Sequence, residues 1–118
     1  LVQINAAFQK AVGDPNVQVT YGAPTVIYVS CKNEDEEIIK GCNAGVVMEN
    51  MLLEAADLGL GAVYLFGVSQ VLFANEEITK LLQIPEGFRT VSAIAVGISA
   101  DALQERTLGT DKISTTTL

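Results

Sequence analysis

The chain has 118 residues, with seven Lys and Arg against fourteen Asp and Glu, a net charge of −7 and no His. This length suits one small domain. Because the chain is negatively charged and its sequence has no cluster of basic residues, we expect neither nucleic acid nor a membrane as a partner. The absence of His excludes Ser-His-Asp and Cys-His nucleophile pairs and His-based zinc sites from these residues.

The composition predicts a folded domain in a reducing compartment. Apolar residues make up 49% of the chain and charged residues 18%, which argues against disorder and suits either a tightly packed monomer or cover by a second subunit. No apolar run reaches the ~20 residues of a membrane helix, and no signal peptide pattern is visible. Cys31 and Cys42 are too few for a disulfide framework, so we expect a cytoplasmic protein.

The first third of the chain predicts a helix, a strand and a loop. Apolar residues recur at helical spacing until Gly13, which predicts a helix over 1–12. Residues 25–30 are mostly β-branched or aromatic with almost no alternation, which predicts a central strand covered on both faces. Four acids within 33–37 favour a solvated loop over a metal site, because the alternate spacing and glycine of a calcium loop are missing.

Residues 43–58 predict a helix that is covered from two sides. Their polar residues fall within an arc of about 140°, leaving about 220° apolar, whereas a surface helix needs little more than a 100° stripe. Glycines 59 and 61 end this helix, so they do not predict a dinucleotide-binding loop. Residues 62–66 predict a buried strand that closes on Gly67. Cys42 precedes the helix and is interpreted as a small buried apolar residue in preference to a reactive thiol.

The last third predicts a short helix, a strand and a polar tail. Asn75 is a suitable N-cap for a helix with two acids in its first turn, and residues 85–87 form a turn into a strand over 90–99. The tail 112–118 has β propensity but little apolar surface, and we expect it to pair with the sheet edge of a partner. The element order α-β-α-β-α-β predicts a layered α/β or α+β domain.

Four segments together resemble the FMN-dependent nitroreductase family, in its order and spacing across almost the whole chain: residues 22–30, 42–61, 84–88 and 93–97. The resemblance implies an α+β fold, a nitroreductase-like three-layer sandwich with a mixed central sheet. It also implies an intertwined homodimer with the long helix at its centre and FMN at the subunit interface.

The resemblance also assigns binding residues. Tyr64, Leu65, Phe66 and Gly67 match the stretch that contacts the flavin ring, and a backbone amide near Phe66 or Gly67 would donate to the flavin. Arg106 best matches the basic residue that binds the FMN phosphate, and guanidinium is suited to phosphate because it binds two oxygens at once.

The chain departs from the family in two places. A second basic residue of the family falls where this chain has Gln104, and the family's Arg-x-Ser-x-Arg phosphate motif is not found in these residues. We therefore expect 1–118 to be a single nitroreductase-like domain that lacks the N-terminal part.

The function that the resemblance implies is an oxidoreductase reaction. FMN would take a hydride from NADH or NADPH and pass electrons to a small acceptor such as a nitroaromatic or a quinone. The flavin carries the chemistry, so no catalytic side chain and no metal site are assigned. The alternative is a non-catalytic dimeric or small-ligand-binding module that keeps the fold without flavin.

Overall fold

The computed structural model describes residues 1–72 and 75–102, together with residues 104, 105, 107, 109, 114, 116 and 117. Its helices and strands follow in this order: α1 (Val2–Val12), β1 (Thr25–Lys32), α2 (Glu37–Asp57), β2 (Gly61–Tyr64), α3 (Phe66–Leu72), α4 (Glu76–Leu81) and β3 (Phe88–Gly97). No helix among these residues is long and apolar enough to cross a membrane.

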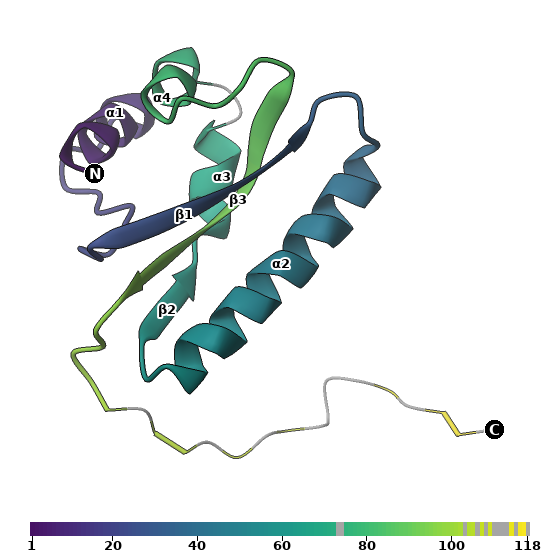
Figure 1. Cartoon of the computed structure of the whole chain (residues 1–118). Helices are drawn as coiled ribbons and strands as arrows, with labels where there is room; N and C mark the ends of the chain where they lie inside the picture. Colours follow the sequence, from purple (N-terminus) through teal and green to yellow (C-terminus); the bar gives the residue numbers. More distant parts are fainter. Residues whose placement is uncertain are drawn as a thin grey trace.

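The elements form three layers, as the predicted α+β sandwich requires. α2 packs along one face of the sheet, against β2 and β3 (Figure 1). α3 packs on β3 from the opposite face, and α1 and α4 lie beside it and contact each other. Each layer covers the apolar face of its neighbour, because a sheet and an amphipathic helix both need a second surface to exclude water.

The sheet has the order β1-β3-β2, and both pairings are antiparallel. Its central strand is therefore β3, and the prediction that 25–30 form a central strand is wrong: β1 lies at one edge, and Ile27 is 43% exposed. The β-branched run correctly predicts a strand but cannot fix its place in the order. A mixed sheet, as the resemblance implies, also contains a parallel pair of strands, and the described residues form only the two antiparallel pairs.

Small residues in the central strand allow α3 to approach the sheet closely. Ala93 and Ala95 are buried toward α3, in one apolar cluster with Leu65 and Val68. The second apolar cluster has three buried residues: Ala7 and Phe8 of α1, and Ile78 of α4. Tyr28 contacts both clusters, and burial raises the pKa of its hydroxyl.

The helix predicted over 43–58 begins six residues earlier, at Glu37. The predicted acidic loop therefore keeps only its first four residues. An acid in the first turn of a helix interacts favourably with the helix dipole, so Glu37 stabilises the earlier start. Lys40 follows within one turn and is almost fully buried, with its Nζ donating to the carbonyl of Asn33 at 2.9 Å.

The two faces of α2 differ in what covers them. Ala44, Met48 and Ala55 are buried on the face that packs on the sheet. On the other face Val46 is 64% exposed and Leu53 is 60% exposed. Helical geometry puts these two within the arc of about 140° that holds the polar residues, so the outer face mixes apolar and charged groups. The sheet covers one side of the helix, as predicted.

Two end signals are confirmed. Gly13 follows α1 with φ of +76°, a conformation that glycine adopts without strain. Asn75 caps α4: its Oδ1 accepts a hydrogen bond from the N–H of Ile78 at 3.1 Å. The predicted strand over 90–99 is present as Phe88–Gly97. The tail prediction for 112–118 falls largely on residues outside the described part of the chain.

Candidate functional site

The four expected ring contacts lie together where β2 ends and α3 begins. The predicted strand over 62–66 is wrong at its end: β2 stops at Tyr64, and Phe66 is the first residue of α3. Leu65, Val68 and Val71 supply the reason, because their spacing of three residues is helical and places all three against the apolar clusters. A short apolar run does not distinguish this helix from a strand.

The turn between β2 and α3 is anchored to the central strand. The N–H of Leu65 donates to the carbonyl of Ala93 at 2.8 Å, and its side chain is 3% exposed. The next residue, Phe66, is 60% exposed. Phe66 and Gly67 belong to the first turn of α3, whose N–H groups have no acceptor within the helix itself. The turn therefore holds one side chain in the core and presents the next to solvent.

A cavity of about 280 Å³ opens beside this turn, and we name it the aromatic cavity. Four of the seven Phe and Tyr residues of the chain line it: Phe8, Tyr21, Tyr64 and Phe66. The rings of Tyr64 and Phe66 meet edge to face, with centroids 6.0 Å apart and planes at 71°. The rest of the wall is apolar apart from Gln18, with Leu65, Gly67, Val68, Val71, Val12, Val17 and Val19. Such a wall favours a flat apolar ligand.

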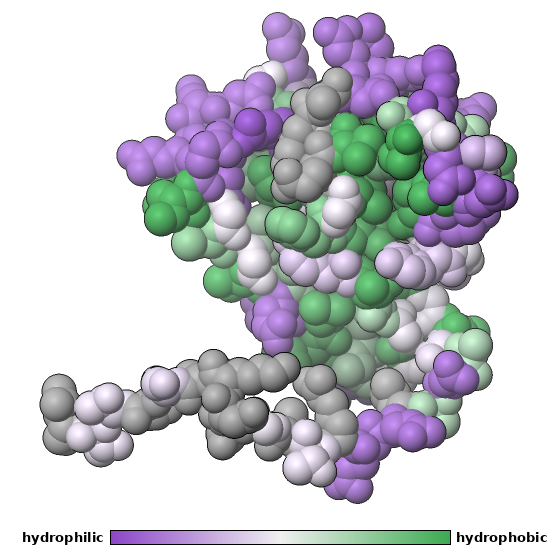
Figure 2. Space-filling view, turned by 180° about the vertical axis from the view of Figure 1, so that it is seen from behind, coloured by the Kyte–Doolittle hydropathy of each residue, from purple (hydrophilic) through white to green (hydrophobic). Residues whose placement is uncertain are grey.

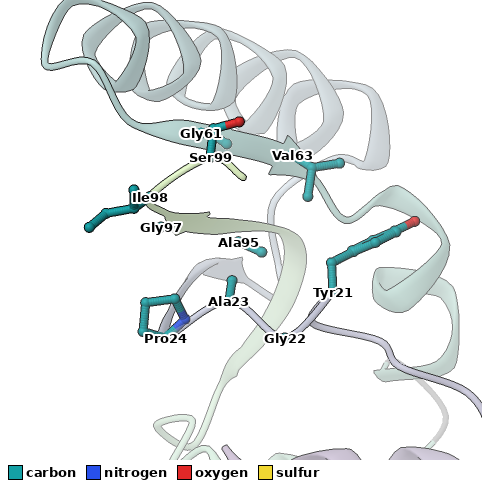
Figure 3. A pocket seen from close by; sticks show the side chains of 11 residues that line it. Tyr21, Gly22, Ala23, Pro24, Gly61, Val63, Ala95, Gly97, Ile98 and Ser99 are labelled. Atoms are coloured by element: carbon teal, nitrogen blue, oxygen red, sulfur yellow. The ribbon is translucent and has the colours of Figure 1, made fainter. Parts of the chain in front are cut away.

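A second cavity of about 330 Å³ lies at the end of the sheet where β1 and β2 begin and β3 ends, and we name it the sheet-end cavity (Figure 3). Backbone approaches backbone closely there. A Cβ at Gly97 would lie 2.8 Å from Cδ of Pro24, and one at Gly61 would lie 3.1 Å from Cβ of Ser99. Tyr21 lines this cavity and the aromatic cavity alike.

Neither cavity has a charged residue in its described wall. The basic side chains of the described residues all form ion pairs with glutamates: Lys10 with Glu77 at 3.1 Å, Lys32 with Glu34 at 3.7 Å, Lys40 with Glu37 at 3.0 Å, Lys80 with Glu76 at 3.8 Å, and Arg89 with Glu37. Arg106, the expected phosphate contact, lies outside the described residues, as does Lys112.

Glu37 joins two cations at the start of α2, at the end of the sheet opposite the sheet-end cavity. It pairs with buried Lys40 and with Arg89, which comes from the start of β3. Hydrogen bonds from Lys40 and then from Arg89 hold the pKa of the Glu37 carboxyl below its usual value. The cluster fastens α2 to β3 and has no place in either cavity wall, so its role is structural.

Two expectations for Cys42 are wrong, namely its burial and its position just before a helix. Cys42 is exposed, and it is not close to a helix start, because α2 begins five residues before it. The thiol therefore gains little from the helix dipole, whose effect fades within the first turn. Cys31 in β1 is also free and is partly buried.

The model of the nitroreductase family matches residues 2–98. The fold resembles that of a nitroreductase with bound FMN from Bacteroides fragilis, with a TM-score of 0.74 and 21% identity over 97% of this chain and 66% of that one. A nitroreductase with bound FMN from Desulfitobacterium hafniense gives a TM-score of 0.72 and 18% identity, over 98% and 69% of the two chains.

An FMN-dependent nitroreductase from Clostridium difficile gives a TM-score of 0.67 and 20% identity, over 98% of this chain and 70% of that one. These likenesses show a shared fold. The chain spans about two thirds of the length of these structures. No curated protein matches it.

Proposed function

This chain belongs to the nitroreductase family, and from that premise we propose that it is an FMN-dependent oxidoreductase. The proposed donor is NADH or NADPH, and the proposed acceptor is a nitroaromatic, a quinone or a similar small molecule. One observation of the structure supports this most: the aromatic cavity, walled by four of the chain's seven Phe and Tyr residues, lies at the turn whose residues were expected to contact the ring. When bound, FMN supplies the hydride and electron transfer.

The described residues fit the ring of FMN. The dimethylbenzene part of this flat ring matches a wall of aromatic and aliphatic side chains, and its polar part matches the backbone amides of the turn and Gln18. The volume of about 280 Å³ is just below the ~300–1,000 Å³ of ligand pockets, so the cavity would hold the ring and leave the rest of the molecule outside. Within this proposal Tyr64, Leu65, Phe66 and Gly67 contact the ring, and the amide of Phe66 or Gly67 donates to it.

The phosphate of FMN needs a cation that the described wall of the aromatic cavity does not supply, since no basic side chain lines it. We assign this role to Arg106, on the resemblance of its position to the family pattern. A guanidinium binds phosphate through two parallel hydrogen bonds, which fixes orientation as well as charge.

The proposal includes a homodimer built on α2. Val46 and Leu53 on the outer face of this helix are more than half exposed, and Ile38 and Ile39 near its start are exposed as well. Apolar surface is not confined to this helix: Figure 2 shows it over the middle of the face seen from behind, with hydrophilic side chains along the upper margin. A second copy would remove such surface from water. The two free cysteines suit the reducing cytoplasm that the sequence predicts.

The experiment is a flavin titration of the purified chain. We expect bound FMN to appear in the absorbance and quenched fluorescence of the flavin, and oxidation of NADH or NADPH when a quinone is added. Arg106→Ala should weaken FMN binding, and more so at low ionic strength because salt screens the contact. Lys32→Ala removes the same charge from an exposed pair and serves as the control. A chain that takes up no FMN would overturn the proposal.

The second candidate function is a dimeric or small-ligand-binding module without flavin. The absence of any basic side chain from the described walls of both cavities favours it, because an anionic cofactor bound there would have no cation among these residues. The flavin titration separates the two candidates. A dimer in sedimentation that binds an aromatic ligand and no FMN would support the module.

A further inference from the structure

A third cavity, of about 400 Å³, lies between α1 and the segment that leads from it to β1, and we name it the amide cavity. Four polar side chains line it: Asn5 and Gln9 from α1, and Gln18 and Thr20 from the segment. The rest of the described wall is small or aliphatic, and none of it is charged. The volume falls within the ~300–1,000 Å³ of ligand pockets. This wall therefore suits a neutral ligand that forms hydrogen bonds.

Hydrogen bonds to the backbone fix how the two amides of α1 are turned. Oδ1 of Asn5 accepts from the N–H of Val19 at 3.2 Å, and Nε2 of Gln9 donates to the carbonyl of Val17 at 3.0 Å. Because an amide oxygen only accepts and an amide nitrogen only donates, neither group can turn over without losing its bond. Among the described residues, the other atoms of the two amides have no hydrogen-bond partner. One donor, Nδ2 of Asn5, and one acceptor, Oε1 of Gln9, are left for a ligand.

These two atoms belong to neighbouring side chains. Asn5 and Gln9 are four residues apart in α1, a spacing that puts Cβ atoms about 5–6 Å apart on one side of a helix. Thr20 adds a hydroxyl to the same cavity. This residue is 6% exposed, and its hydroxyl has no hydrogen-bond partner within the described part of the chain. A nearly buried polar group without a partner costs free energy, which a ligand bound in the cavity would offset.

A donor beside an acceptor matches the edge of an adenine ring. Adenine accepts at a ring nitrogen and donates from the adjacent 6-amino group, and Asn and Gln side chains recognise it by this pattern in DNA. Here Nδ2 of Asn5 would donate to the ring nitrogen, and Oε1 of Gln9 would accept from the amino group. Ala6 and Ala23 in the wall leave room for a flat ring, and the lack of charge suits a neutral one.

We propose that the amide cavity binds the adenine ring of the NADH or NADPH donor. This inference rests on the proposed function. The carboxamide of nicotinamide has the same pattern, but the nicotinamide end must reach the flavin to transfer its hydride. The aromatic cavity, which would hold the flavin ring, adjoins the amide cavity, since Gln18 lines both. The adenine end is therefore the part of the donor that is left for the amide cavity, where it adds affinity without taking part in the chemistry.

The first test uses adenosine, which carries the ring without phosphate or nicotinamide and needs no flavin. In inosine an oxygen replaces the 6-amino group and would face Oε1 of Gln9. Calorimetric titration of the purified chain should show adenosine binding at least about tenfold more tightly than inosine, because a site built to hydrogen-bond one group rejects an analogue that lacks it. Equal affinities, or no binding of adenosine at millimolar concentration, would overturn the inference and leave the flavin proposal intact.

The second test uses Asn5→Asp, which keeps the acceptor for the N–H of Val19 and removes the donor. Adenosine binding should weaken about tenfold, because the ring nitrogen loses its donor and faces a second acceptor. Gln3→Glu is the matched control: it adds the same charge to α1, outside the amide cavity. Its Kd should stay within about twofold of wild type, since adenosine is neutral. Thermal unfolding checks that both variants fold, and an unchanged Kd in Asn5→Asp would overturn the inference.

The third test separates the adenine of the donor from a free adenine nucleotide. In the flavin-loaded protein with 1,4-benzoquinone as acceptor, Asn5→Asp should raise the KM for NADH about tenfold at unchanged kcat, the sign of lost binding alone. For reduced nicotinamide mononucleotide, which has no adenine, kcat/KM should stay within about twofold of wild type. An unchanged KM for NADH beside weakened adenosine binding would overturn the assignment to the donor. A chain that binds adenosine as expected but takes up no FMN would refute the proposed function and keep the adenine site.

Discussion

The two faces of α2 predict opposite responses to the loss of a side chain. Met48 is 1% exposed on the face that packs on the sheet, whereas Val46, two residues earlier, is 64% exposed. Truncating a buried Met to Ala costs about 2–5 kcal/mol, because it removes burial and leaves a cavity. For 118 residues the entropy of unfolding is about 0.25 kcal/mol per degree, so Met48→Ala should lower Tm by about 8–20 °C.

Val46→Ala should behave differently. In one isolated chain the change removes little buried surface and introduces a better helix former, so stability should stay within about 0.5 kcal/mol. If a second copy covers this face, the variant loses stability only where the dimer forms. Unfolding by urea at two protein concentrations about a hundredfold apart separates the cases, because the stability of a dimer depends on concentration.

The expected pattern is a large loss for Met48→Ala at both concentrations and a loss for Val46→Ala at the higher one alone. A loss for Val46→Ala that equals that of Met48→Ala at both concentrations would refute the assignment of the faces. Equal and negligible effects of both would refute the packing of α2 on the sheet.

Two further predictions concern pH and backbone contact. The lowered pKa of Glu37 means that its stabilisation is full above the ordinary carboxyl pKa and is lost as pH falls through the lowered value. Wild type should therefore be more stable than Glu37→Gln in urea unfolding at pH 7 and lose this advantage as the pH falls through the lowered pKa of Glu37; a difference independent of pH would contradict the assignment. Gly97→Ala should cost about 1–3 kcal/mol, since its Cβ would lie 2.8 Å from the rigid ring of Pro24. Gly45→Ala, with no atom within 4 Å, should instead stabilise α2 by about 0.5–1 kcal/mol, and equal effects would refute the contact.

Local signals in the sequence predict two helix boundaries correctly. Gly13 ends a helix because its backbone adopts a left-handed conformation, and Asn75 starts one because its side chain accepts a hydrogen bond from the first turn. The start of α2 was missed although a signal existed: an acid three residues before Lys40 is typical of a first helical turn. The four acids within 33–37 instead suggest a solvated loop.

Features set by distant residues were beyond the sequence. The place of β1 at an edge depends on β3, which lies more than fifty residues later. The apolar run after Ala62 fits a strand or a helix, and only its packing against Ala93 decides between them. The four expected ring contacts are consecutive in the sequence and stay a prediction, whereas the grouping of Tyr21 with Tyr64 and Phe66 around one cavity arises from tertiary structure alone.

The bond from Leu65 to Ala93 has a consequence for how the site could diversify. In the turn after β2, Leu65 is fixed to the core by this bond, whereas Phe66 is exposed and can be substituted. Substitutions at Phe66 or Tyr21 change the wall of the aromatic cavity with little effect on the core, because both side chains are more than half exposed. Selection or a directed-evolution library can therefore vary the cavity wall at these two positions while the fold stays unchanged.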